Sequence, residues 1–353
     1  MHVLNQVQFA GTDELLKIWV ARYLPELGAI SNQVKNHVEN RLRLTITDES
    51  RLATYHQIIS HLISDCDHAA TDTKKLLLAV GLPPDSWEMQ ELSTQTYKIY
   101  ETLMDCYAAS FIFSPILEHL HILDSEAGKL KATALVIPKF ESLIQIIGPQ
   151  IRDLKAMYFS SVNRHLVGFM TTHMHFTRQS ILHRLDPYEH IWLAPYLQLL
   201  DELICIPWQR ICSVASTNTS NPNTIALVRR MIPKVHSISS HTYQKTLRAY
   251  PNHISCQGRI QSSAVQHSVI RDINMLQAYI WLCVLEDSVA VIEKQLLPIC
   301  LQVFSLTDVD WDIVTFGIQT IVDMIQQQLT PSEQNLFEKH ANTIESLFLN
   351  AKL

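Results

Sequence analysis

The segment SSAVQHSVIRDINMLQAYIWLCVL, residues 262–285, decides the fold class of this chain. Its apolar residues lie on nearly every side of a helix. They are Ile273, Leu276, Ile280, Trp281, Val284 and Leu285. A helix that is hydrophobic all round belongs at the centre of a domain, because only enclosure by other elements removes all of its sides from water. We therefore expect 262–285 to be a central helix.

The composition points to the same fold class. The 353 residues include only eight glycines, and hairpins and phosphate-binding loops depend on glycine more than helices do. Apolar stripes at helical spacing predict further helices. Their ranges are 48–70, 87–113, 129–147, 151–174, 195–212, 225–247, 288–304, 311–328 and 332–348. We expect Gly148-Pro149 to separate two helices and Pro207 to kink another. The sequence predicts an all-α protein.

The order of these stripes predicts two antiparallel helical bundles. Short connections up to Met174 predict an N-terminal helical bundle over residues 1–176. The polar residues His175–Pro187 are expected to be a linker. A C-terminal helical domain is then expected over residues 187–353.

Charge divides the C-terminal half sharply. Residues 203–271 contain no Asp or Glu and eight Lys or Arg. Residues 272–353 contain eleven acidic residues against three lysines. Two interpretations stay open. The basic segment binds an anionic partner, or it pairs internally with the acidic C-terminal helices, since complementary surface charge is common and each pair is weak.

Two segments carry a resemblance. Cys205-Ile-Pro-Trp-Gln-Arg-Ile-Cys212 and Arg271-Asp-Ile-Asn-Met-Leu-Gln-Ala-Tyr-Ile-Trp-Leu-Cys-Val-Leu-Glu286 resemble segments of uncharacterised helical proteins of cyanobacteria. The resemblance covers the C-terminal half, includes no catalytic motif and brings no known function. It implies a bacterial cytosol.

The basic segment supplies the main functional hypothesis. Clustered arginines with aromatic neighbours suit carboxylate or phosphate recognition, because the guanidinium fork bonds two oxygens and a ring can stack on a planar group. The candidate partner-binding residues are Arg229, Arg230, Lys234, Arg248, Arg259, Tyr243 and Tyr250. We expect a non-enzymatic interaction or regulatory protein that docks an acidic protein surface or an anionic ligand. Nucleic acid is disfavoured, because the rest of the chain is acidic.

Two alternatives use other residues. A haem or other tetrapyrrole could bind between helices through His165, His173 or His183 in a sensor or carrier protein. Glu118 and His121 have the ExxH spacing of di-iron bundles, but a second complete pair is not present. Asp308-Val-Asp-Trp-Asp312 lacks the glycine and glutamate of a calcium loop, so helix capping explains it better.

Several classes of function have no support. The sequence contains no GxSxG, GxGxxG or GxxxxGK[ST] motif, so nothing favours an enzyme. Seven cysteines without a CxxC pair indicate reduced thiols. No signal peptide is recognisable, and the longest uncharged apolar stretch, Ile273–Leu285, is 13 residues. We expect a cytoplasmic protein.

Overall fold

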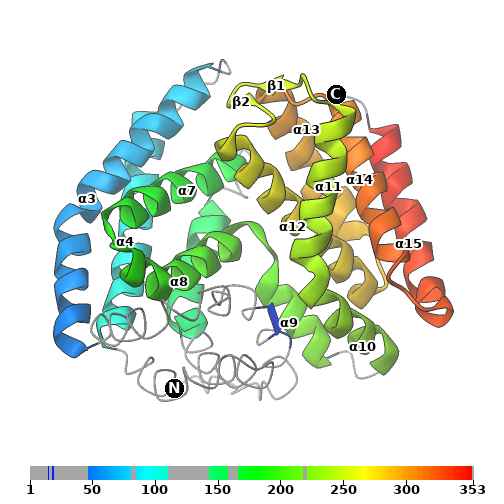
Figure 1. Cartoon of the computed structure of the whole chain (residues 1–353), viewed down its shortest axis with the longest axis horizontal. Helices are drawn as coiled ribbons and strands as arrows, with labels where there is room; N and C mark the ends of the chain where they lie inside the picture. The colour runs from blue at the N-terminus through cyan, green and yellow to red at the C-terminus, as the bar shows by residue number, and fades with distance from the viewer. Residues whose placement is uncertain are drawn as a thin grey trace, which may run out of the picture. The chain divides into compact units, whose positions relative to one another are not determined.

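A computed structural model describes residues 47–79, 81, 85–109, 143–157, 166–217 and 221–351, together with Leu15, Ile18 and Trp19 (Figure 1). The chain divides into two compact units. Val20–Cys205 is here named the α3–α8 unit, and Ile206–Leu353 with Met1–Trp19 is named the α9–α15 unit. In the described residues both consist of helices apart from one two-stranded hairpin, and the all-α prediction is confirmed.

The α3–α8 unit begins with a long helical hairpin. Helices α3 (Asp48–Ala79) and α4 (Ser86–Ala108) pack against each other, and α3 also contacts α7 (Leu166–Arg184). Helix α8 (Pro187–Cys205) packs on α7. Asp85 caps α4 in a capping box with Glu88, which fixes where the second arm of the hairpin starts.

Two breaks expected in this unit are absent. Residues 143–157 form one helix through Gly148-Pro149, because Leu143, Ile147, Ile151 and Leu154 keep one apolar stripe that is buried along its length. Burial of this stripe outweighs the hydrogen bond that Pro149 cannot donate. The expected linker 175–187 is helical as far as Arg184, because Thr177 and Ile181 are buried on the inner side of α7.

Pro207 ends one helix and starts another instead of kinking a single one. Helix α8 ends at Cys205, and α9 (Trp208–Thr217) begins immediately afterwards. Pro207 lacks an N–H and cannot continue α8, but its fixed φ suits the start of α9. The boundary between the compact units lies here. A division into independently folding domains at 176 and 187 stays a prediction.

In the α9–α15 unit, the expected central helix is confirmed. Helix α12 (Ser263–Glu286) contacts α9, α10 (Pro222–Met231), α11 (Val235–Ala249), α14 (Trp311–Gln326) and α15 (Pro331–Asn350). The side chains from Ala278 to Leu285 are all buried. Three polar side chains of this core are hydrogen-bonded to one another: Gln277 Nε2 donates to Ser239 Oγ at 2.7 Å, and Ser239 Oγ donates to Asn274 Oδ1 at 2.7 Å.

Shorter elements complete this unit. The 3₁₀ turn η4 (Ile232–Lys234), with Pro233, divides the single helix expected at 225–247. The strands β1 (Ile254–Ser255) and β2 (Gly258–Arg259) form a small hairpin between α11 and α12. Before α13 (Leu297–Leu306) lies the π-helical turn η5 (Ile292–Leu296). Asp310 caps α14, as expected from the alternating acids.

Among the described helices, none is long and apolar enough to cross a membrane.

Candidate functional site

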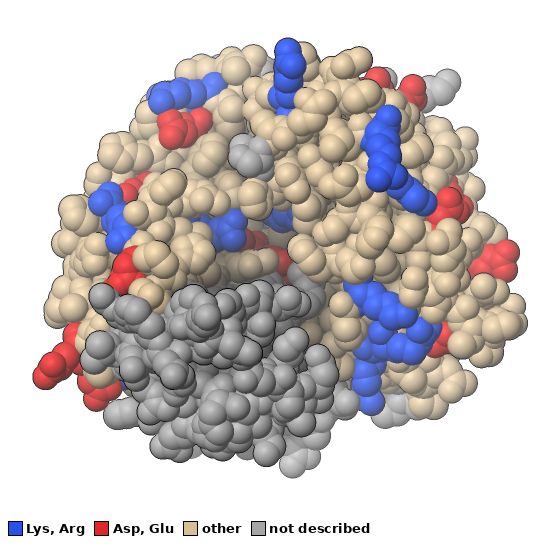
Figure 2. All heavy atoms as spheres, viewed as in Figure 1, with Lys and Arg blue, Asp and Glu red and all other residues tan. Residues whose placement is uncertain are grey.

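The predicted basic face is spread over four elements of the α9–α15 unit. Arg229 and Arg230 lie in the last turn of α10, Lys234 lies in η4, Arg248 lies near the end of α11 and Arg259 lies in β2. Figure 2 shows Lys and Arg side chains in separate groups over the part of the face that α10 and α11 occupy. The environments of these groups differ, and so do their roles.

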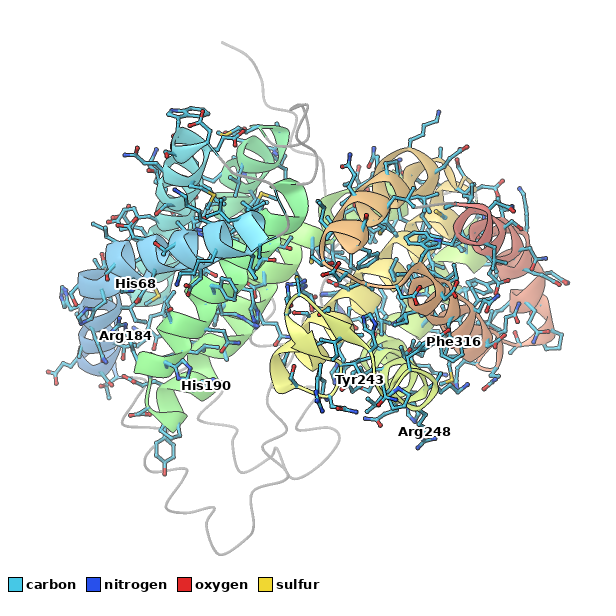
Figure 3. All side chains as sticks on the ribbon, turned by 90° about the horizontal axis from the view of Figure 1, so that it is seen from above. His68, Arg184, His190, Tyr243, Arg248 and Phe316 are labelled. Atoms are coloured by element: carbon cyan, nitrogen blue, oxygen red, sulfur yellow. The ribbon has the colours of Figure 1, made fainter. Side chains whose placement is uncertain are left out.

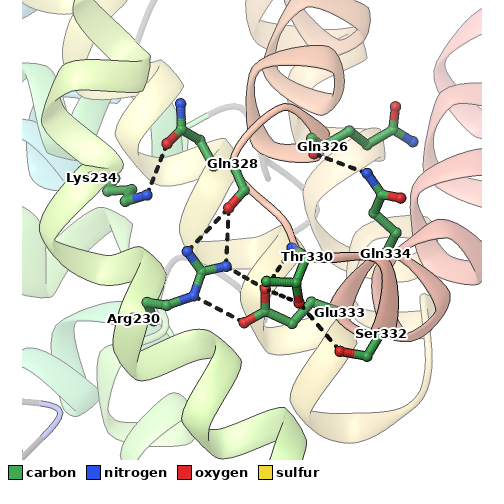
Figure 4. A network of polar contacts seen from close by, with 8 residues as sticks. All are labelled: Arg230, Lys234, Gln326, Gln328, Thr330, Ser332, Glu333 and Gln334. Atoms are coloured by element: carbon green, nitrogen blue, oxygen red, sulfur yellow. Dashed lines mark hydrogen bonds and ion pairs between the residues drawn. The ribbon is translucent and has the colours of Figure 1, made fainter.

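Arg230 is held by the start of α15 (Figure 4). Its guanidinium donates two hydrogen bonds to the Glu333 carboxylate, at 2.9 Å from Nε and 2.5 Å from Nη2. It also donates to the Gln328 carbonyl at 3.1 Å. Lys234 Nζ donates to Gln328 Oε1 at 2.8 Å. These four residues, with Thr330, are named the α15 clamp below.

Glu333 of the α15 clamp also caps the N-terminus of α15. It lies at the third position of α15, and its Oε2 accepts the Thr330 N–H at 2.8 Å in a capping box. The bonds from Arg230 and Thr330 outweigh partial burial and lower the pKa of Glu333 to about 2. Arg230 therefore joins α10 to the beginning of α15.

Two further cations of the basic segment have acidic partners in the chain. Arg210 donates to both oxygens of Glu286, at 2.5 Å and 2.7 Å. Arg271 pairs with the neighbouring Asp272 at 2.9 Å. Arg210, Arg230 and Arg271 are thus each paired with an acidic residue of the segment 272–353.

The cations that point to solvent lie elsewhere. Lys245 and Arg248 on α11 and Arg259 on β2 are exposed, and none has an ion pair within the described part of the chain. Figure 3 shows Arg248 at the outer edge of its helix. The hairpin returns against α11, because Tyr243 donates its hydroxyl to the Ile260 carbonyl at 3.0 Å. We name Lys245, Arg248 and Arg259 the exposed basic patch.

The two predicted aromatic residues have structural roles. Tyr243 is 2 % exposed, so its ring cannot stack on a ligand at the surface. Tyr250 is half-buried and packs edge-on against Phe316, with ring centroids 5.5 Å apart. Partial burial and the nearby Asp312 and Asp310 raise the pKa of Tyr250. Acidic side chains therefore border the exposed basic patch on the α14 side.

The two histidines of the tetrapyrrole hypothesis that the structure describes, His173 and His183, are not brought together. His165 lies outside the described residues, and His183 is exposed near the end of α7. His173 is fully buried on the same helix. Burial lowers the pKa of His173 to about 4, although the Ala69 backbone and Asp67 favour its charged form. His173 is therefore a neutral core histidine.

Within the described residues, nothing assembles the site of the di-iron alternative. Glu118 and His121 lie outside the described residues. Asp65 accepts two hydrogen bonds from Arg184, and Asp105 accepts one from Tyr55. In the described ranges, no group of three or more His, Cys, Asp or Glu could hold a metal ion.

Burial of His173 predicts acid sensitivity of the α3–α8 unit. The unfolded chain takes up a proton near pH 6.5 and the folded chain only near pH 4, so stability is lost as the pH falls between these values. When the pH falls from 7 to 5, the free energy of unfolding of the wild type should therefore drop by about 2 kcal/mol more than that of His173→Phe. Urea denaturation at both pH values measures this difference. His183→Gln is the control and should retain the loss. Equal pH slopes for His173→Phe and the wild type would contradict the assignment.

The α15 clamp predicts that Arg230 contributes to stability. Arg230→Glu should lower the free energy of unfolding by about 1–3 kcal/mol, because it removes charge-assisted bonds and places a second carboxylate beside Glu333. Thermal and urea denaturation measure this loss. Arg248→Glu, an exposed control on α11, should change stability by less than about 0.5 kcal/mol. Similar losses in the free energy of unfolding for both variants would contradict a stabilising role of the α15 clamp.

Comparisons with known proteins give one similarity. No curated protein and no solved structure matches the chain. The family model described as "Phycobilisome protein" matches residues 208–348, which is less than half of the chain. The match runs from α9 into α15 and includes α12, the α15 clamp and the exposed basic patch. The α9–α15 unit is thus similar to a phycobilisome protein.

Proposed function

We propose that the α9–α15 unit is a non-enzymatic docking module that binds an acidic surface of another protein through the exposed basic patch. The observation that carries the proposal is the separation of the cations into two sets. Arg210, Arg230 and Arg271 are paired within the chain, whereas Lys245, Arg248 and Arg259 are exposed on α11 and the hairpin.

The match to a family described as phycobilisome proteins supports the same proposal, since a phycobilisome is an assembly of proteins.

The acidic residues beside the exposed basic patch limit which partner surface can bind there. Asp310 and Asp312 lie beside Tyr250, so a uniformly acidic partner would be repelled on the α14 side. We therefore expect a partner surface with carboxylates opposite Arg248 and Arg259 and a neutral or basic margin. Electrostatic complementarity of this kind sets specificity and association rate more than affinity.

The exposed basic patch predicts which charge reversals abolish docking. The triple variant Lys245→Glu, Arg248→Glu and Arg259→Glu should lose capture of partner proteins from the native host, while its melting temperature stays within about 2 °C of the wild type. Affinity purification from the host with quantitative mass spectrometry measures capture. Capture by the wild type should also fall as salt is raised.

A matched control reverses charge outside the patch. Lys294→Glu in η5 changes an exposed cation of the same unit and should leave capture unchanged. Retention of every wild-type partner by the triple variant would overturn the proposal. Loss of the same partners with Lys294→Glu would show a response to net charge alone.

Tetrapyrrole binding is the second candidate, favoured by the family match. Covalent attachment through sulfur needs an accessible thiolate. Burial raises the pKa of Cys256 and of Cys300 and raises that of Cys283 to about 12, so these thiols do not suit such a linkage. These three thiols therefore fit non-covalent binding better than a thioether.

An absorption spectrum of the protein purified from its native host separates the two candidates. The docking proposal predicts a protein spectrum without a band beyond 350 nm. A band that is lost when the protein is unfolded and extracted with organic solvent would identify a non-covalent chromophore. A band that stays with the unfolded polypeptide would contradict the conclusion that these thiols do not suit a covalent linkage.

A further inference from the structure

The outer face of the α3–α4 hairpin, far in sequence from the basic segment, combines exposed apolar residues with carboxylates. We propose that this α3–α4 face docks a basic amphipathic helix of another protein. Helix α3 contributes Leu52, Ile59 and Ile63, and α4 contributes Tyr97, Glu101 and Asp105. The inference concerns the α3–α8 unit and is independent of the function proposed for the α9–α15 unit.

Two hydrogen bonds define how these residues face one another. Tyr55 donates its hydroxyl to Asp105 at 2.9 Å, and Ser93 donates to Asp67 at 2.9 Å. Both pairs belong to the same antiparallel register, since the sequence distance from Tyr55 to Asp67 equals that from Ser93 to Asp105. In this register Ile63 lies level with Tyr97 and Ile59 lies level with Glu101.

The apolar part of the face is open to solvent. Ile63 is 62 % exposed and Leu52 is 45 % exposed, and Ile59 between them is half-buried. The three residues follow one another at intervals of seven and four, so they lie on one side of α3. From Leu52 to Ile63 the stripe extends for about 16 Å, which is about three turns of helix. That length suits the apolar face of one short helix.

The carboxylates of the face are held in place. Tyr97 donates its hydroxyl to Glu101 Oε1 at 2.6 Å, as Tyr55 does to Asp105. The bond to Glu101, with lesser contributions from burial and nearby carboxylates, raises the pKa of Tyr97 to about 12. Within the described residues neither carboxylate has an ion pair, and each accepts one hydrogen bond. Their remaining oxygens can accept bonds from lysine or arginine of a docked helix.

The charge of the hairpin decides which occupant fits. Helix α4 carries four acidic residues and a single basic one, Lys98. On α3, the two lysines Lys74 and Lys75 lie beyond the stripe, and Lys75 pairs with Asp72 at 2.7 Å. A second copy of this hairpin would bring acidic surfaces together, which is unfavourable for two like-charged faces. A basic helix gains both apolar burial and ion pairs at the same face.

The test uses the full chain and a synthetic probe. The probe is a fluorescent 18-residue peptide of leucine and lysine whose leucines recur at helical spacing, and binding is followed by fluorescence anisotropy. Ile63→Ser and the double variant Glu101→Lys, Asp105→Lys should each weaken binding at least tenfold, since each removes one of the two contributions. The matched controls Ile146→Ser and Asp153→Lys alter an exposed isoleucine and an exposed acid on helix 143–157, and should bind within twofold of the wild type.

Three results would overturn the proposal. The first is equal binding by the face variants and the wild type. The second is equal binding of a peptide with the same composition in scrambled order. The third is sedimentation of the wild type as a dimer that Ile63→Ser dissociates, which would assign the face to a second copy of the chain. Circular dichroism confirms that the variants fold, and Leu52→Ser replaces any variant that does not.

Discussion

The α9–α15 unit depends on the enclosure of α12. A helix that buries every side chain from Ala278 to Leu285 has to be surrounded, and α9, α10, α11, α14 and α15 supply the surrounding surface. In this core the side chains of Ser239, Asn274 and Gln277 are hydrogen-bonded in series. Since an unpaired buried amide is costly, this short network also fixes how α11 lies on α12.

The same enclosure explains the charge partition. Helices from the basic segment and helices from the acidic segment cover α12 side by side, so their outer edges meet. Arg230 forms a bidentate pair with Glu333 across such an edge, and Arg210 forms one with Glu286 at the end of α12 itself. Part of the basic charge in the acid-free segment 203–271 therefore serves the packing of these helices. Lys245, Arg248 and Arg259 have no ion pair within the described residues, although α11 packs against α14.

The two units present different surfaces. On the α9–α15 unit, the exposed basic patch lies next to the acids before α14, and the exposed Ile254 pairs with Arg259 in the hairpin. On the α3–α8 unit, the α3–α4 face joins exposed apolar residues to carboxylates that tyrosines hold in place. The partners proposed for the two units are therefore of opposite charge. Each surface also differs enough in chemistry for its partner to be recognised separately.

The sequence alone determined the helical class, the central position of 262–285 and the helix cap within Asp308–Asp312. These features depend on local periodicity and on hydrogen bonds within one turn, which neighbouring residues reveal. The tertiary structure alone decided which basic residues form ion pairs within the chain, because Arg230 and Glu333 lie 103 residues apart in the sequence. It also decided that Tyr243 is buried and that the helix continues through Pro149. In both cases packing against distant elements outweighs the local preference, and no local pattern carries that information.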